Sequence, residues 1–203
     1  MEHGVASTSR AIATLTEAFF RDPLTEFLLA NVGTRARWLS LCMELLLGLS
    51  EKCGQVHTVD DDRGVLGVFP PGRYPYSLAT GSALFARMVL RGLSPRFPVS
   101  AGVNFLKLTY QCDQRHIKEP HWYVLVIGVH PQRQGRGLSR QLFAPVLTQA
   151  DHAGLPCYLE NSNPKNLAVY SRFGFKVLDE IRPMERGPPL FLMRRDPVQP
   201  PGR

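Results

Sequence analysis

The sequence predicts one mixed α/β domain over residues 1–195, in which helices cover a central sheet. Helical and strand-like stretches follow one another in the order ααββααβαβαββ, a pattern typical of such folds. The stretch HWYVLVIGV at 121–129 is apolar almost throughout and rich in aromatic and β-branched residues, which indicates a central strand covered on both faces. A glycine-rich turn and a further helical stretch follow this strand. The length of 203 residues also suits a single domain.

The first half of the chain is expected to be mainly helical. Apolar residues recur at helical spacing over 8–30, and Asp22-Pro23 interrupts the run, so two helices should meet there at a corner. Beyond this corner we expect a helix over 34–52, a β-hairpin over 55–72 with an acidic turn, and helices over 76–91 and 99–117.

The second half alternates between strands and helices. After the glycine turn, a helix should run to Ala153, where Gly154 and Pro156 stop it. Pro164 and Gly174 have the positions typical of the start and the stop of a short helix. Strands are expected over 157–161, 175–182 and 190–195, and the Pro-rich segment 196–203 should be a disordered tail.

The charge and the cysteines narrow the class of protein. Lys and Arg number 24 against 17 Asp and Glu, a formal net charge of +7, yet no long run of basic residues occurs. A protein that binds a small polyanion shows the same balance, so we do not expect nucleic acid as a partner. The four cysteines lie far apart without metal-ligand spacing, which predicts free thiols in a reducing compartment and no metal.

No segment of the sequence points to secretion or to a membrane. The N-terminal MEHGVASTSR lacks the basic and apolar regions of a signal peptide. The apolar stretch WLSLCMELLLGLS at 38–50 carries Glu44 and is shorter than the roughly 20 apolar residues that cross a bilayer. We therefore expect a cytoplasmic protein, monomeric or homodimeric, with no membrane partner.

The segment GVHPQRQGRGLSRQL at 128–142 predicts a phosphate site. Gly135 and Gly137 let the turn adopt positive φ and let a ligand approach the backbone. The helix that follows begins with amides that have no partner inside the helix, and its dipole favours an anion there. Arg133 and Arg136 add positive charge. The spacing is not that of a nucleotide P-loop, and the alternative is a solvated turn whose glycines serve geometry alone.

Two motifs in this half of the chain resemble those of the GNAT N-acetyltransferase superfamily. Gln132-Arg133-Gln134-Gly135-Arg136-Gly137 is similar to the acyl-CoA motif Q/R-x-x-G-x-G/A of that family. LENSNPKNLAVYSRFGFKV resembles the following strand, Asn-containing loop and helix that ends in Tyr-x-x-x-Gly-Phe. The resemblance covers residues 116–195, and it extends to the branch that includes puromycin N-acetyltransferase.

This resemblance implies a twisted, mostly antiparallel sheet of about six or seven strands whose two central strands splay apart. Acetyl-CoA would be the cosubstrate, with its pantetheine arm in the gap and its pyrophosphate on the amides of residues 134–139. Gly128 is a plausible bulge residue of the first of these strands. Asn166 would bind the pantetheine or cap the short helix. The implied coenzyme-binding residues are Ile127, Gly128, Val129, Arg133, Gln134, Gly135, Arg136, Gly137, Leu138, Ser139, Asn166 and Tyr170.

Acyl transfer to an amine needs a neutral nucleophile and favours protonation of the departing thiolate. In the family, a tyrosine that matches Tyr170 gives up this proton, which makes Tyr170 the candidate general acid; packing is its alternative role. Glu160, which should point towards the gap between the strands, is the candidate general base. His121 and His130 compete with it for this role, and an acceptor of low amine pKa would need no base at all.

The acceptor site is less well defined by motifs. Phe20, Asp22, His121, Trp122 and Tyr123, together with the neighbouring Phe19, could line it, and Asp22 could attract a cationic amine. The alternatives are core packing for the aromatic residues and helix capping for Asp22.

The predicted function is acetyl-CoA-dependent N-acetylation of a primary amine on a small molecule, drug-like or metabolite, by direct transfer in a ternary complex. The alternative is a non-catalytic acyl-CoA-binding sensor or interaction module of the same fold. Tyr170 beside an intact glycine turn favours the enzyme.

Overall fold

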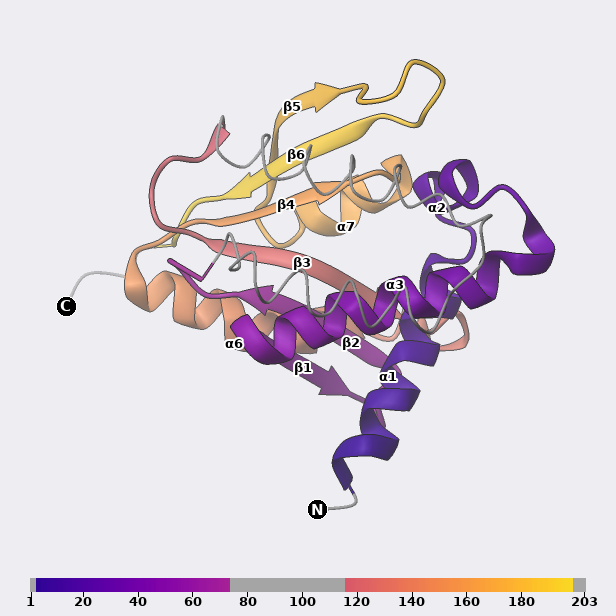
Figure 1. Cartoon of the computed structure of the whole chain (residues 1–203). Coiled ribbons are helices and arrows are strands. Elements are labelled where there is room, and N and C mark those ends of the chain that lie inside the picture. The colour runs from indigo at the N-terminus through magenta and orange to yellow at the C-terminus, as the bar shows by residue number, and fades with distance from the viewer. Residues whose placement is uncertain (1–2, 74–115, 199–203) are drawn as a thin grey trace.

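The computed structural model of the chain describes residues 3–73 and 116–198. The mixed α/β fold is confirmed: within these described residues, helices flank one sheet of six strands in the order β1-β2-β3-β4-β6-β5 (Figure 1). The helices expected over 76–91 and 99–117 lie outside the described residues, except for the last two positions. The elements are α1 (His3–Phe19), α2 (Pro23–Leu28), α3 (Val32–Cys53), β1 (Gln55–Val59), β2 (Gly64–Phe69), β3 (Trp122–Val129), η1 (Pro131–Arg133), α6 (Leu138–Ala153), β4 (Cys157–Asn161), η2 (Pro164–Asn166), α7 (Leu167–Ser171), β5 (Lys176–Ile181) and β6 (Leu190–Arg195).

The two central strands of the sheet separate soon after they meet. β3 and β4 are parallel and pair only at Trp122 with Cys157 and at Tyr123 with Tyr158. Every other neighbouring pair of strands is antiparallel and has at least five residue pairs. Beyond Tyr123, β3 and β4 diverge along the chain direction, as Figure 1 shows. We call the opening between 124–129 and 159–161 the split.

A bulge on β3 lies at the start of the split, two residues after the last β3–β4 pair. Val124 is opposite Val68 on β2, and Val126 is opposite Gly67, so Leu125 is the extra residue. The prediction of a bulge at Gly128 is therefore wrong, because Gly128 pairs regularly with Val65. Gly128 instead lies under α1, where an added Cβ would be 2.7 Å from the Leu15 side chain. Glycine at this position allows α1 to pack closely on β3.

The two faces of the sheet pack against different helices. On one face, Phe143 and Val146 of α6 share a core with Leu66 and Trp122. On the other face, α1 and α3 pack against β2 and β3 through separate apolar clusters. Side chains alternate along a strand, so Trp122 faces α6 and Tyr123 faces the side of α3. The chemistry at the split can therefore differ between its two faces.

A partly buried ion pair joins the end of β6 to α6. The guanidinium of Arg195, which is 6% exposed, donates to both carboxylate oxygens of Asp151 at 2.8 Å. It also donates to the Phe173 carbonyl at 2.9 Å, and the Val198 amide donates to Asp151 at 2.7 Å. The Val198 amide thus ties the start of the segment 196–203, for which the sequence predicts disorder, to α6, and positions 199–203 lie outside the described residues.

Replacing Arg195 with methionine should lower the free energy of unfolding by about 3 kcal/mol at pH 7, because Asp151 would lose its cation. Burial raises the pKa of Asp151. The hydrogen bonds from Arg195 and Val198 lower it by more than burial raises it, so the pKa lies below its usual value. The pair's contribution is therefore present above the unfolded pKa of about 3.9 and lost as pH falls through the lower folded pKa.

Urea unfolding at pH 7 and at about pH 3 tests this, since the loss should be smaller at the lower pH. Arg194→Met on the same strand is the matched control, because Arg194 pairs with the more exposed carboxylates of Glu119 and Asp196. An equal loss of stability in both variants at pH 7 would contradict the larger contribution expected of the Arg195–Asp151 pair.

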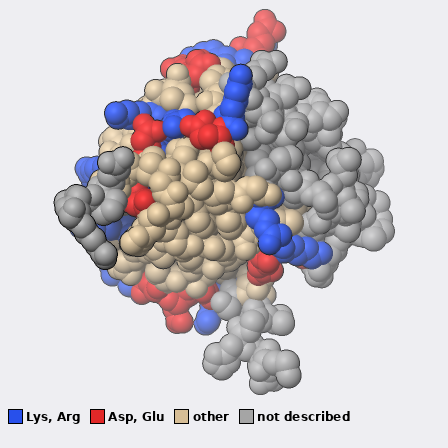
Figure 2. Space-filling view, turned by 90° about the vertical axis from the view of Figure 1, so that its left-hand side faces the viewer, with Lys and Arg blue, Asp and Glu red and all other residues tan. Residues whose placement is uncertain are grey.

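The distribution of charge on the surface bears on whether the chain binds a nucleic acid. On the face at the left of Figure 1, Lys and Arg side chains lie near Asp and Glu side chains around a broad uncharged centre (Figure 2). On the described part of this face, the positive charge forms no continuous stripe of the kind that tracks a nucleic-acid backbone.

Within 3–73 and 116–198, none of the helices combines the length and the apolar character that crossing a membrane requires.

Candidate active site

The split is the central feature of the site. In the described residues, the ladder between β3 and β4 stops after two residue pairs, so the inner edges of both strands lack a neighbouring strand beyond Tyr123 and Tyr158. Backbone N–H and C=O groups need hydrogen-bond partners when water is excluded. An extended ligand with amide groups can supply these partners, as a peptide does when it adds to a sheet edge.

The glycine turn between β3 and α6 has the conformation that its sequence predicts. Gly135 and Gly137 have φ of 76° and 77°, and an added Cβ at either position would meet no protein atom within 4 Å. Gly137 is the N-cap of α6, and no side chain caps this end of the helix. The N-terminus of a 16-residue helix is thus open to an anion.

Charged and polar side chains border this turn. Arg133 is 3.5 Å from an Asp60 carboxylate oxygen, so part of its charge is balanced within the chain. Arg136 is exposed and has no carboxylate partner among the described residues. Gln134 donates from its side chain to the Val129 carbonyl at 3.1 Å and so ties the turn to the end of β3. Arg136 therefore offers an exposed positive charge beside this turn.

The turn between β1 and β2 adds a contact that sequence reasoning missed. Asp60, Asp61 and Asp62 have φ of 52°, 58° and 63°, a left-handed conformation that Asp tolerates better than most residues. This turn brings Asp60 to Arg133 and brings Asp62 to Arg10 at 3.5 Å. Three adjacent acidic residues are a turn signal, but the sequence does not reveal which arginine they meet.

Tyr170 lies on α7, and its ring is held by other aromatic rings. Phe143 and Phe175 meet it edge-on, with ring centroids 6.3 and 6.1 Å away. Burial raises the pKa of Tyr170, and the negative charge of Asp22 raises it further. The phenol therefore stays protonated through the neutral pH range and can donate a hydrogen bond or a proton.

Glu160 bridges the start of the split. Its carboxylate accepts a hydrogen bond from the Tyr123 hydroxyl at 2.7 Å, so a side-chain contact joins β4 to β3 just past their last backbone pair. Tyr123 is buried, and its ring stacks on Phe69 and Tyr158 with centroids 6.2 and 6.0 Å away. A fixed ring thus orients the half-buried carboxylate on the face of the sheet that α3 covers.

Asp22 joins the α1–α2 corner to the loop after β4. It is 8% exposed, and one of its carboxylate oxygens accepts from the Leu24 amide at 3.0 Å and from the Ser162 hydroxyl at 2.9 Å. Burial raises the pKa of Asp22 even though these hydrogen bonds oppose the rise. Asp22 therefore caps α2, the alternative given above, and also lies within electrostatic reach of Tyr170. Its pairing with Ser162 has no signal in the sequence.

The remaining candidates are dispersed. His121 donates from Nδ1 to the Glu119 carbonyl at 2.9 Å, and its ring meets Tyr158 edge-on at the paired end of the strands. Trp122 faces α6 and not the side of Tyr123. Phe20 packs on the α1 and α3 side of the sheet. The structure thus places Asp22 within electrostatic reach of Tyr170, and Glu160 in hydrogen-bond contact with Tyr123. Trp122 lies on the opposite face of the sheet from Tyr123.

Two further residues have contacts that limit their roles. Nδ1 of His130 accepts from the Gln132 amide at 3.3 Å, and its Nε2 is 2.9 Å from the Glu17 carboxylate, so both ring nitrogens are engaged. Asn166 makes no capping hydrogen bond, and Asn163 caps the short helical segment instead. Within the described residues, no group of three or more His, Cys, Asp or Glu side chains could hold a metal ion.

Comparisons with known proteins agree with this geometry. The Acetyltransferase (GNAT) family matches residues 101–175. An uncharacterized N-acetyltransferase of Schizosaccharomyces pombe is 28% identical over 197 residues, which cover 93% of this chain and 79% of the relative.

Solved structures show the same fold. The structure titled histone acetyltransferase HPA2 and related acetyltransferase from Corynebacterium glutamicum is 22% identical with a TM-score of 0.63, and the match covers 97% of this chain and 94% of that one. Arylalkylamine N-acetyltransferase 2 from Aedes aegypti is 13% identical with a TM-score of 0.55, and 94% of each chain is covered. The puromycin N-acetyltransferase branch stays a prediction. The acyl-CoA motif, the split sheet and these matches all support a GNAT-type N-acetyltransferase, whose family model covers residues 101–175 of this chain.

Proposed function

We propose that the chain transfers the acetyl group of acetyl-CoA to a primary amine of a small molecule, directly and in a ternary complex. The observation that carries this proposal is the split between β3 and β4. The uncapped N-terminus of α6 lies at the end of the glycine turn that follows β3, and Glu160 and Tyr170 belong to β4 and to the helix after it. In this proposal, a coenzyme-binding surface and two proton-transfer groups would serve one opening.

The residues present fit a coenzyme A thioester. The inner edge of β3 at Ile127, Gly128 and Val129 would pair with the pantetheine amides. The amides of 134–139 would hold the pyrophosphate, because they include the uncapped start of α6 and the open space beside Gly135 and Gly137. Acetyl-CoA would supply a thioester, an acyl group already activated for transfer to nitrogen.

Two side chains of the chain would move the protons. Glu160 would accept the proton that the amine loses as the new C–N bond forms. Tyr170 would donate its proton to sulfur as the C–S bond breaks, and its raised pKa means that the proton is present at neutral pH. Protons and charge then balance over one transfer, without an acyl group on the protein.

The acceptor is the least constrained part of the proposal. It would enter from the α1 and α3 side, where the α1–α2 corner with Phe20 and Asp22 and the Glu160–Tyr123 pair lie. The Aedes aegypti neighbour is named for an arylalkylamine, but likeness at 13% identity concerns the fold. Asp22 and Glu160 on this side suit a cationic amine, and a small molecule as its carrier is part of the proposal that the amine panel below tests.

Steady-state rates of CoA release with a panel of small amines test this function. A ternary complex predicts intersecting lines when both substrates are varied, whereas a covalent acetyl-enzyme predicts parallel lines. Binding of acetyl-CoA without CoA release for any amine or peptide would favour the alternative of an acyl-CoA sensor.

Replacing Gly137 with valine should weaken acetyl-CoA binding at least about a hundredfold, because a branched side chain would strain the turn and fill the space in front of the α6 amides. Isothermal titration measures the Kd. Gly154→Val is the matched control: Gly154 ends the same helix with φ of 65° and similar open space. Both variants should lose stability, and only Gly137→Val should lose the coenzyme. Normal binding by a folded Gly137→Val protein would refute the phosphate site.

A further inference from the structure

We infer that Arg35 is a positioning residue for the acceptor site, because it fixes the α1–α2 corner that carries Phe20 and Asp22. This inference rests on the proposed function and adds a residue to it that no motif contains. Arg35 lies in the first turn of α3 and is 5% exposed. A buried guanidinium needs several hydrogen-bond acceptors, and those of Arg35 come from both sides of α2.

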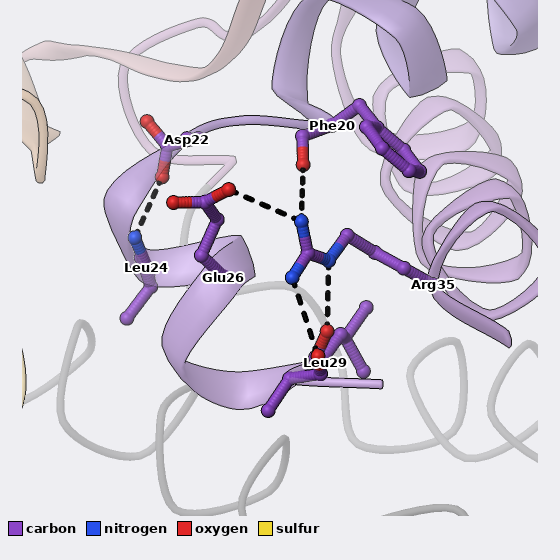
Figure 3. A network of polar contacts seen from close by, with 7 residues as sticks. Phe20, Asp22, Leu24, Glu26, Leu29 and Arg35 are labelled. Atoms are coloured by element: carbon purple, nitrogen blue, oxygen red, sulfur yellow. Dashed lines mark hydrogen bonds and ion pairs between the residues drawn. The ribbon is translucent and has the colours of Figure 1, made fainter. Parts of the chain in front are cut away.

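The hydrogen-bond acceptors of Arg35 belong to the corner and lie around its guanidinium group (Figure 3). Nε donates to the Leu29 carbonyl at 2.8 Å, and Nη2 donates to the Ala30 carbonyl at 3.4 Å. Nη1 donates to the Phe20 carbonyl at 3.3 Å and to the Glu26 carboxylate at 3.2 Å. The guanidinium also lies over the Phe20 ring, 5.3 Å from its centroid.

These contacts hold the ends of two helices. The Phe20 carbonyl follows the last residue of α1, and the Leu29 and Ala30 carbonyls follow the last residue of α2. Carbonyls at helix C-termini lack partners within the helix and carry partial negative charge, which a buried cation stabilises. A six-residue helix such as α2 cannot hold its position by its own hydrogen bonds. Arg35 at its C-terminal end and Asp22 at its N-terminal end therefore fix it.

The corner in turn reaches the proposed proton donor. Asp22, two residues after Phe20, accepts from Ser162 in the loop between β4 and α7. The charge of Asp22 also raises the pKa of Tyr170 on α7. A shift of the corner would move this carboxylate relative to Tyr170 and would reshape the wall of the acceptor site. Arg35 would thus act on the acceptor through Phe20 and Asp22, without touching it.

The proposed phosphate-binding turn at 134–139 should be affected less by this corner than the acceptor site, although α1 contacts Gly128 of β3 and His130 just after it. The glycine turn leads into α6, which packs on the opposite face of the sheet from α1 and α3. Within the described residues, the side-chain hydrogen bonds, ion pair and ring contact of Arg35 all involve positions 20–30, and none involves 130–141. A defect in the corner should therefore raise the KM of the amine and leave that of acetyl-CoA nearly unchanged.

The test compares Arg35→Lys with Arg195→Lys. Lysine keeps the charge but cannot span four acceptors. Arg195 is the matched control because it is also buried and also joins a carbonyl to a carboxylate, but it lies at the far end of α6. Both variants should lower the melting temperature. Only Arg35→Lys should raise the KM of the amine, by about tenfold to a hundredfold, with the KM of acetyl-CoA within about twofold.

Glu26→Gln should change the KM of the amine less than about twofold, because the Glu26 side chain is 51% exposed and the three carbonyl contacts would remain. An unchanged KM of the amine in a destabilised Arg35→Lys protein would overturn the inference and reduce Arg35 to a stability role. An equal KM increase in Arg195→Lys would overturn it as well.

Hydrogen exchange separates this inference from the proposed function. Arg35→Lys should speed exchange at the Leu24 amide and over 162–166, and Arg195→Lys should not, whether or not an acceptor is known. Unchanged exchange over 162–166 in Arg35→Lys would overturn the coupling, even in an active enzyme. Failure of the wild-type chain to acetylate any amine would instead count against the proposed function.

Discussion

Replacing Tyr170 with phenylalanine should lower kcat by about 10- to 1000-fold and leave the Kd of acetyl-CoA nearly unchanged, as expected for the loss of a positioned general acid. The ring would still pack between Phe143 and Phe175, so the variant should fold. Because burial and Asp22 raise the pKa of Tyr170, the wild-type rate should show no decline from tyrosinate formation as pH rises from 7 to about 10.

Tyr158→Phe is the matched control for this variant. Tyr158 is a fully buried tyrosine on β4, and it lies where β3 and β4 are still paired. Removal of its hydroxyl should affect stability more than kcat. An unchanged kcat in Tyr170→Phe at saturating amine would assign Tyr170 to packing alone.

Replacing Glu160 with glutamine should lower kcat about a hundredfold at neutral pH with an amine that is mostly protonated. Glutamine keeps the shape and can still accept from the Tyr123 hydroxyl, so the change removes basicity and little else. The loss should shrink as pH rises, since a base matters less once the amine is already neutral. Rates over a range of pH, at saturating acetyl-CoA, measure this trend.

Glu180→Gln on β5 is the control for the loss of one carboxylate, because Glu180 is exposed on an edge strand away from the split. A loss in Glu160→Gln that does not change with pH would indicate that the carboxylate positions the amine by charge. No loss at all would leave His121 or the absence of a base, since both ring nitrogens of His130 are engaged.

Local signals in the sequence were sufficient for the elements that frame the site. Gly135 and Gly137 adopt the positive φ that their turn requires, and Gly154 ends α6 in the same way. Asp22-Pro23 marks the corner between α1 and α2 because proline fixes φ and the aspartate caps the next helix. Such features depend on neighbours in the chain, which the sequence shows directly.

Features that depend on packing between distant segments could not be predicted in this way. Glycine is a common residue type at a bulge, which is why the sequence suggests Gly128. The structure instead has glycine there because α1 packs closely on it, and the bulge is at Leu125. The pairing of Asp22 with Ser162 joins positions 140 residues apart and has no sequence signal. Strand alternation, by contrast, could have separated Trp122 from Tyr123, since adjacent residues of a strand face opposite sides.

The most direct test of the central claim follows a labelled acetyl group. The wild-type chain is incubated with acetyl-CoA labelled in the acetyl group and a panel of small primary amines, and the label is located by mass spectrometry. The account predicts label on at least one amine and none retained on the protein. Transfer should be lost in Gly137→Val and in the double variant that carries Tyr170→Phe and Glu160→Gln. Tight binding of acetyl-CoA with no label on any amine, or equal transfer by these variants, would contradict it.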